Sequence, residues 1–586
     1  MIMLLCHRLV PLHRVTRIAL ALLLSAASAV AAAAAPAPAA KKALPAATGS
    51  LADGNAATVS AESALLRGDC GNASTYYVKA ARQLAAAQLA QRATTVALEC
   101  GQYASALAAA ERWVQLAPGD SAAALAQVQA ALVNLRISEA RDYFKAWLSG
   151  ANRNLPDALA QLQQDTGSEA LLLLMRGFEH PALHTAVAQR ALGELALDSW
   201  DAHAALGYAE AARAAGAKAP DVAMLVARAQ AVLGNEAAAL SAAHEAATEK
   251  SNRLAMAQVL LLLGKEAEAE TELQRLRSDD EVGPAASRQL AQLAFEKGDY
   301  AITEQRCTSM LSVQSSAALA VYLLGVIAER RGDDSSALRH YSVLLGTGLD
   351  TPGRRRAAGI LYRQGDREAA LRVFAPEPDA SPSERIHADI AAADLLSLVD
   401  APEESLGRIG DALRRSPGNA ELEYQHAVLL ERAGKIDAAL QLLETMHRAR
   451  PLDAAVTNAL GFTLADHKRA LPRAEQLIRE ALHSQPDDPA MLDSLGWVLF
   501  RRGQIAGAAP ILERAYRLLH DGDIGGHWGQ ALWAQGQKSA ARAVWQRALT
   551  ADPENPRLLA TVAHYAPDIS APKPPPALES APRTTI

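Results

Sequence analysis

The chain is poor in aromatic residues, and its positive and negative charges nearly balance. Phe, Tyr and Trp make up only 4% of the 586 residues, whereas half of the residues are apolar and alanine dominates. Small apolar side chains suit close helix-on-helix packing and argue against a β-rich fold. Because the formal net charge is −6, we expect no surface for nucleic acid and no polybasic patch for a membrane.

The sequence also lacks a recognisable catalytic motif. It contains no Gly-x-Ser-x-Gly elbow, no phosphate-binding glycine loop and no Cys-x-x-Cys pair. His244-Glu245 begins like a zinc-protease helix, but Thr248 stands where the second histidine is required. An enzyme decorated with repeats would need its active site in 134–220, which looks helical and carries no credible residue set. We therefore predict a protein that is not an enzyme, with no metal, cofactor or small-molecule substrate.

Three near-copies of one pattern stand in a row between Pro451 and Pro553. The copies contain Asn458-Ala459-Leu460-Gly461-Phe462, Asp493-Ser494-Leu495-Gly496-Trp497 and Gly526-His527-Trp528-Gly529-Gln530. An alanine follows each copy about twenty residues later, at Ala481, Ala515 and Ala548. The repeats close at Pro451, Pro486, His520 and Pro553. A period of roughly 34 residues with these features resembles the tetratricopeptide repeat (TPR), a pair of helices joined by a tight turn.

Turn signals extend this period upstream as a ladder of corner residues. The corners are Gly234, Gly264, Gly298, Gly332, Gly365, Asp400, Gly434, His467, Gly503 and Gly536, with two earlier turns at Gly68 and Gly101. Between Asn134 and Pro220 the helical segments lack a clear register and are interpreted as degenerate repeats. The sequence thus predicts an all-α, TPR-type α-solenoid, a right-handed superhelix of about 13 to 15 helical hairpins.

Both ends of the chain differ in composition from the repeats. We expect 1–31 to be a cleavable signal peptide, with a basic start, an apolar run from Ile18 to Ser28 and a small-x-small site at 29–31. An uncleaved anchor is the alternative. The expected order is then a flexible Ala/Pro linker at 32–55, degenerate repeats at 56–220, regular repeats at 221–566 and a disordered Pro-rich tail at 567–586. A longer loop from Glu377 to Ser383 is a candidate bend.

Cys70 and Cys100 occupy matching corners of neighbouring helix pairs. In an exported chain a disulfide between them is plausible, and two separate buried thiols are the alternative. Cys307 is interpreted as a single packed residue within a helix.

Candidate binding residues lie on the first helix of each pair, which lines the concave groove of a TPR superhelix. Aligned on the corners, these positions are Tyr322, Arg355, Tyr362, Arg363, Tyr424, Asn458, Phe462, Asp493, Trp497, Phe500, Arg501 and Trp533. Large aromatics and arginines anchor partners in extended grooves. The same aromatics can instead pack on the next helix, and the arginines can be solvated charges.

The Asp493-Ser494-Leu495-Gly496-Trp497 block, followed by Trp528 to Trp533 and Ala541 to Trp545, resembles a family of exported bacterial TPR proteins. Its best-understood member is the outer-membrane lipoprotein adaptor of a periplasmic carboxy-terminal processing protease. The resemblance implies a scaffold that holds the protease and presents peptidoglycan hydrolases to it. Because no lipobox follows the apolar run, we expect a periplasmic chain whose membrane association is at most indirect. The alternative is a TPR component of a polysaccharide or protein export machine.

Overall fold

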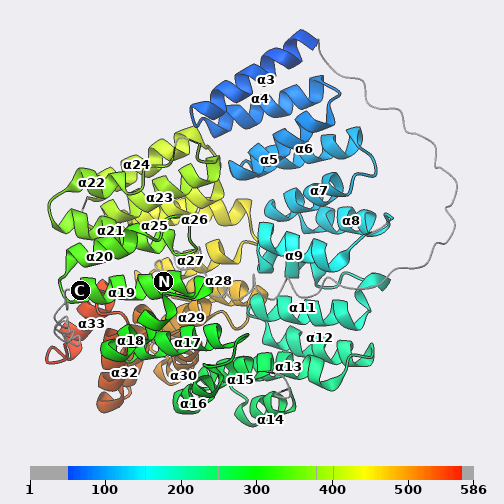
Figure 1. The fold of residues 1–586 in the computed structure, drawn as a ribbon. Coiled ribbons are helices and arrows are strands. Elements are labelled where there is room, and N and C mark those ends of the chain that lie inside the picture. The colour runs from blue at the N-terminus through cyan, green and yellow to red at the C-terminus, as the bar shows by residue number, and fades with distance from the viewer. Residues whose placement is uncertain (1–50, 152, 247–249, 378, 400, 571–586) are drawn as a thin grey trace, which may run out of the picture. The chain divides into compact units, whose positions relative to one another are not determined.

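The computed structural model describes residues 51–570 except 152, 247–249, 378 and 400. The predicted signal peptide, the corner at Asp400, and most of the predicted linker and tail lie outside the described residues. The described part is all-α, with 31 α-helices, one short 3-10 helix and no strand (Figure 1). Helices α3 to α24 and α27 to α32 form fourteen pairs of contacting helices in chain order, in agreement with the predicted number of hairpins.

The described chain divides into two compact units, each made of two stretches of sequence. The unit of 51–178 and 376–429 contains α3 (Leu51–Leu66), α4 (Cys70–Gln83), α5 (Ala87–Glu99), α6 (Tyr103–Leu116), α7 (Ser121–Val133), α8 (Ile137–Leu148), α9 (Leu155–Thr166), α10 (Ser168–Met175), α23 (Pro382–Leu398), α24 (Pro402–Arg415) and most of α25 (Ala420–Arg432). The unit of 179–375 and 430–570 contains η1 (Pro181–Leu183), α11 (Ala186–Asp198), α12 (Ala202–Ala214), α13 (Ala219–Leu233), α14 (Glu236–Ala246), α15 (Lys250–Leu262), α16 (Glu266–Leu276), α17 (Gly283–Glu296), α18 (Tyr300–Met310), α19 (Gln314–Arg330), α20 (Asp334–Ser342), α21 (Asp350–Arg363), α22 (Arg367–Arg372), α26 (Ile436–Ala449), α27 (Ala454–Asp466), α28 (Leu471–Ser484), α29 (Pro489–Arg501), α30 (Ile505–Leu518), α31 (Gly522–Ala534), α32 (Lys538–Ala551) and α33 (Pro556–Tyr565).

The corner turns depend on residues in the left-handed region of backbone conformation. Each glycine predicted as a corner has a positive φ, from 66° at Gly101 to 86° at Gly365. The corner expected at His467 is shifted, because His467 has a φ of −89° and Lys468 takes the left-handed conformation instead. Glycine is favoured at such positions because it has no Cβ.

The stretch from Asn134 to Pro220 is more regular than its sequence indicates. Together with α7 just before it, the helices up to α12 form three pairs, α7–α8, α9–α10 and α11–α12, with corners at Leu135, Gly167 and Trp200. Leu135 and Trp200 have φ values of 56° and 57°, although bulky residues rarely adopt them. The prediction missed these two corners because no glycine marks them.

Glycines within the first helices allow close contact with the second helices, as the sequence predicts. A Cβ at Gly461 would lie 2.7 Å from the Ile478 side chain, and a Cβ at Gly496 would lie 2.5 Å from that of Leu512. Larger side chains at these positions would push the paired helices apart.

Two predicted boundaries need correction. Helix α3 begins at Leu51, inside the stretch predicted as linker, because Gly54 in its first turns is buried against the Leu84 side chain. The predicted tail is ordered over its first residues, where the Asp568 carboxylate pairs with Arg542 and the Ser570 carbonyl accepts a hydrogen bond from Gln546.

In the unit that contains α3 to α10, a disulfide joins the first two corners. Cys70 and Cys100 are bonded, with their Cα atoms 5.4 Å apart, and both side chains are buried. The loop after α24 packs on the same corners: the Asn419 side-chain amide donates to the Cys100 carbonyl at 3.1 Å, and Gln102 donates to the Pro417 carbonyl at 2.9 Å. Cys307 is a buried free thiol in α18.

In the other unit, late repeats also contact the corners of early ones. The Arg517 guanidinium donates to the Ala231 carbonyl at 2.9 Å and to the Leu262 carbonyl at 2.6 Å, in the last turns of α13 and α15. The Asp487 amide donates to the Trp200 carbonyl at 2.9 Å. These contacts fix distant repeats against one another within the unit. Among the described residues, no helix is both long enough and apolar enough to span a membrane.

Candidate protein-binding surface

The twelve predicted groove residues differ widely in exposure. Asn458, Phe462, Asp493 and Trp497 are buried, with exposed fractions between 0% and 4%. Arg363 is exposed, and the other seven are half-buried. Burial of the four corresponds to the packing alternative, whereas a binding role for the other eight stays a prediction.

Trp497 is enclosed by side chains of its own and neighbouring repeats. The His527 ring stacks on it at a centroid distance of 4.1 Å, and the Arg501 guanidinium lies 5.0 Å from its centroid. The indole N–H donates to Asp466 Oδ1 at 3.0 Å. The Phe500 ring, which is half-buried, stacks on Trp497 at 5.3 Å. The first helices α27, α29 and α31 are therefore tied together through this tryptophan, and Phe500 is the accessible edge of the stack.

Asp493 and His527 form a buried pair next to the tryptophan. His527 Nδ1 lies 2.9 Å and 3.0 Å from the two carboxylate oxygens of Asp493. A carboxylate only accepts, so Nδ1 carries the proton. Their exposed fractions of 0% and 6% exclude this pair from direct contact with a partner.

A group of acidic side chains surrounds Arg557 of α33. Its guanidinium lies 3.5 Å from Glu431 and 4.0 Å from Asp466, and it stacks 5.8 Å from the Phe462 centroid. Burial alone would lower the pKa of Arg557, but the surrounding carboxylates raise it above its ordinary value. The guanidinium thus stays charged and links α33 to α25 and α27.

Glu431, Asp466 and His467 have potential metal-ligand atoms within 4.8 Å of one another. Both carboxylates already face Arg557, and the imidazole of His467 lies 3.4 Å from Glu431. Because an arginine already supplies the positive charge, the donor set does not favour a metal ion.

Tyr322 and Arg363 belong to a second polar cluster, centred on Glu329 of α19. The buried Glu329 carboxylate accepts from Arg363 at 2.9 Å, from Arg356 at 3.0 Å and from the Tyr341 hydroxyl at 2.8 Å. Tyr322 lies beside them, with its hydroxyl 3.4 Å from Arg356 Nε. Burial alone would raise the pKa of Glu329, but Arg356 together with the hydrogen bonds lowers it below its ordinary value.

Trp533 lies in a third cluster near the end of the repeats. Its ring is 5.7 Å from that of Trp545 and 5.8 Å from that of Tyr565, and Lys538 lies 5.0 Å from its centroid. Trp545 is fully buried and donates to the Gly526 carbonyl, whereas Trp533 is half-buried. Trp533 therefore combines a fixed ring with an accessible edge.

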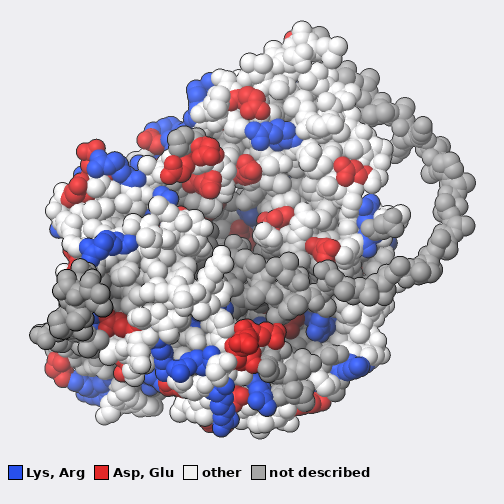
Figure 2. All heavy atoms as spheres, in the orientation of Figure 1, with Lys and Arg blue, Asp and Glu red and all other residues white. Residues whose placement is uncertain are grey.

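Three further predicted residues lie on α21 and α25. Arg355 and Tyr362 are half-buried on α21, and Tyr424 is half-buried on α25 in the other unit. On the face shown in Figure 2, acidic and basic side chains are intermixed over the described residues.

Sequence reasoning missed Glu329, Arg356, His527 and Arg557. His527 stands 34 positions after Asp493, about one period, so that spacing is a signal that pairs them. Arg557 lies on α33, which no second helix follows among the described residues, so the repeat pattern does not single it out. Glu329 and Arg356, which lie beside Tyr322, carry no signal in the sequence, because charged residues are common at helix surfaces.

The C-terminal helices match a known repeat. Residues 424–489, 462–522 and 528–560 fit the model of the tetratricopeptide repeat, and they correspond to α25 through α33. The stretch from 424 to 560 therefore contains tetratricopeptide repeats. The packing of Gly461 and Gly496 agrees with this assignment, because both allow the close helix pairing of a TPR.

Three known proteins illustrate how far the similarity extends. A TPR repeat-containing protein of Pseudomonas aeruginosa is 31% identical over 208 residues, 35% of each chain. A human protein O-mannosyl-transferase is 22% identical over 209 residues, 35% of this chain and 24% of that protein. The solved structure of yeast Tom70 aligns with 87% of this chain and 94% of its own, at 12% identity and a TM-score of 0.30. The chain thus spans about a third or less of the length of these two sequence relatives.

Proposed function

We propose that this chain is a non-catalytic scaffold that binds other proteins along the face formed by the first helices of its repeats. The observation that carries the proposal is a set of half-buried side chains on that face. Tyr322, Tyr362, Phe500, Arg501 and Trp533 all come from first helices of one unit. Aromatic and arginine side chains that are held in place by packing, yet accessible at one edge, are suited to anchor a partner at low entropic cost.

The proposed location is the periplasm, reached by a cleavable signal peptide, with association to the outer membrane at most indirect. The Cys70–Cys100 disulfide supports an oxidising compartment. The Asp493-to-Trp497 block supports the more specific role, in which the scaffold presents peptidoglycan hydrolases to a carboxy-terminal processing protease.

Co-purification from the native envelope tests this role. The chain, tagged at its C-terminus, is crosslinked in cells, and the captured proteins are identified by mass spectrometry. We expect a processing protease together with peptidoglycan hydrolases. Recovery of export or polysaccharide-assembly proteins without a protease would contradict the adaptor role and favour a component of an export machine.

Two variants link capture to the proposed face. Tyr362→Ala combined with Phe500→Ala removes two accessible aromatic edges and should reduce capture at least about tenfold. Val343→Ala combined with Leu345→Ala is the control, because these side chains are 64% and 59% exposed but lie after α20, a second helix. Equal capture by the unmodified chain and by both double variants would show that the partner does not use this face.

A further inference from the structure

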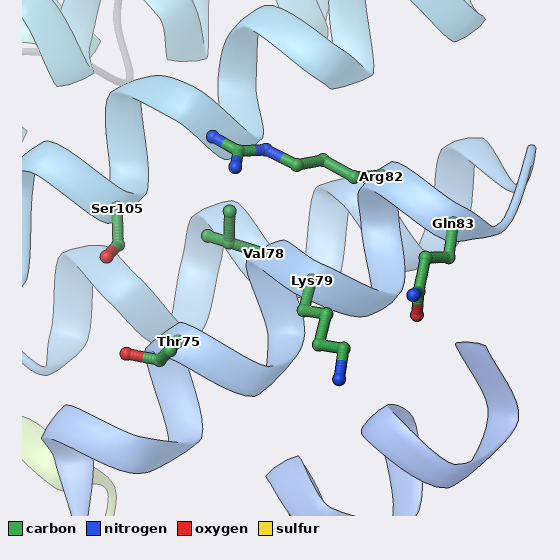
Figure 3. Close-up of a pocket in the computed structure, with 6 residues that line it drawn as sticks. All are labelled: Thr75, Val78, Lys79, Arg82, Gln83 and Ser105. Atoms are coloured by element: carbon green, nitrogen blue, oxygen red, sulfur yellow. The ribbon is translucent and has the colours of Figure 1, made fainter. Parts of the chain in front are cut away.

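A polar depression lies between α4 and α6, the second helices of the first two pairs. Its volume is 310 Å³, and it is lined by Thr75, Val78, Lys79, Arg82, Gln83 and Ser105. Figure 3 shows the Arg82 side chain extended back along α4 above Val78, while the Lys79 and Gln83 side chains point down from the same helix at the rim of the depression. The volume is at the lower limit for a ligand pocket and suits one or two side chains of a partner rather than a large molecule.

The two cations of the lining have no anionic partner among the described residues. Lys79 and Arg82 are exposed, and α4 contains no acidic residue. On the adjacent helices, Glu111 accepts from the Tyr143 hydroxyl at 3.1 Å, Glu62 accepts from Tyr77, and Glu99 interacts with Arg92. The lining therefore carries two positive charges that form no ion pair with a described carboxylate.

A third cation lies buried at the contact between the same two helices. Arg112 of α6 is only 7% exposed and donates to the Ala81 carbonyl at 3.1 Å and to the Gln115 side chain at 3.3 Å. Both acceptors are neutral, unlike the carboxylate that holds Arg356 and Arg363. No described carboxylate forms an ion pair with this guanidinium, so its charge adds to the positive potential between α4 and α6.

We propose that this depression binds an acidic segment of a partner protein. Glutamate or aspartate carboxylates of that segment pair with Arg82 and Lys79, and the Ser105 hydroxyl and the Gln83 amide supply hydrogen-bond donors beside them. Among the described residues the buried Gln83 side-chain oxygen has no hydrogen-bond donor and can accept from a backbone N–H of the segment, and Val78 offers a small apolar contact. The inference rests on the proposed role in protein binding, but it assigns a different surface from the first-helix face.

The test measures binding of a short fluorescent peptide of glutamate and serine to the full chain by anisotropy. We expect binding at low salt that weakens as salt rises, because the contacts are between exposed charges. Lys79→Glu combined with Arg82→Glu should weaken binding at least about tenfold, since like charges then face the peptide. The control, Arg213→Glu combined with Lys218→Glu, changes the net charge equally at exposed positions of the other unit and should leave binding unchanged.

Three results would overturn the proposal: no binding to the unmodified chain, an equal loss in both charge-reversed proteins, or competition by inorganic phosphate at the same concentration as the peptide. The last result would indicate a site for small anions. Because the assay contains no protease and changes no residue of the first-helix face, its failure would leave the proposed scaffold role standing. Loss of envelope capture with intact peptide binding would contradict the scaffold role and leave the site for an acidic segment standing.

Discussion

The imidazole of His527 lies 2.9 Å from the Asp493 carboxylate, and both side chains are buried where α29 and α31 meet. A buried charged group is costly unless it is paired, so the two residues depend on each other. The pair also fixes the ring that stacks on Trp497.

Asp493→Asn should therefore destabilise the C-terminal repeats. The amide keeps the shape but removes the charge that His527 faces, and we expect a loss of about 1–3 kcal/mol in the free energy of unfolding. Urea denaturation followed by tryptophan fluorescence measures it. Asp437→Asn is the matched control, because Asp437 pairs with Arg469 at the surface and its side chain is 89% exposed. An equal effect of the two substitutions would contradict a special role for the buried pair.

We expect that Gly529 cannot be replaced by a residue with a side chain, whereas Gly526 can be replaced by alanine. A Cβ at Gly529 would lie 2.1 Å from Trp545 Nε1, but the nearest atom to a Cβ at Gly526 is 3.8 Å away. We expect Gly529→Ala to cost about 1–3 kcal/mol through overpacking, and Gly526→Ala to be neutral or slightly stabilising because alanine favours helix. Thermal unfolding of both variants decides this, and a stable Gly529→Ala protein would refute the packing at Trp545.

Removing the disulfide should loosen the first two helix pairs. Cys70→Ala combined with Cys100→Ala removes a crosslink between residues 30 positions apart. We expect this to lower the free energy of unfolding by about 3–4 kcal/mol. Hydrogen exchange should then accelerate in α3 to α6. Cys307→Ala, in the other unit, removes a thiol without removing a crosslink and should leave α3 to α6 protected. Unchanged exchange in the double variant would show that packing alone holds these helices.

The Glu329 cluster should make stability fall in acid. The pKa of Glu329 is lower in the folded chain than its ordinary value of 4.5, so ionisation favours folding. This contribution is complete at pH values well above 4.5 and is lost as the pH falls through 4.5 toward the lower pKa of the folded chain. Denaturation curves at several pH values should show a steeper acid loss for the unmodified protein than for Glu329→Gln. Parallel pH profiles would contradict the prediction.

Much of the fold could be predicted from the sequence, because glycine corners and small residues recur at a fixed period. Corners at Gly234 or Gly503 are visible since only glycine adopts their conformation freely, whereas those at Leu135 and Trp200 are stabilised by surrounding structure. Contacts such as Arg517 with the Leu262 carbonyl join residues 255 positions apart and carry no periodic signal.

The candidate surface could be predicted only in part. Alignment on the corners identifies which helix a residue belongs to, but it does not show how far its side chain is covered. Trp497 and Phe500 lie three positions apart, yet one is buried and the other half-buried. The difference arises because His527, from another repeat, covers Trp497.

The most direct test of the scaffold role is the rate at which a purified processing protease cleaves a peptidoglycan hydrolase with and without this chain. The account predicts faster cleavage when the chain is present. It also predicts that Tyr362→Ala with Phe500→Ala removes most of the acceleration, while Val343→Ala with Leu345→Ala preserves it. An identical rate with and without the chain, together with no association of the three proteins in solution, would contradict the account.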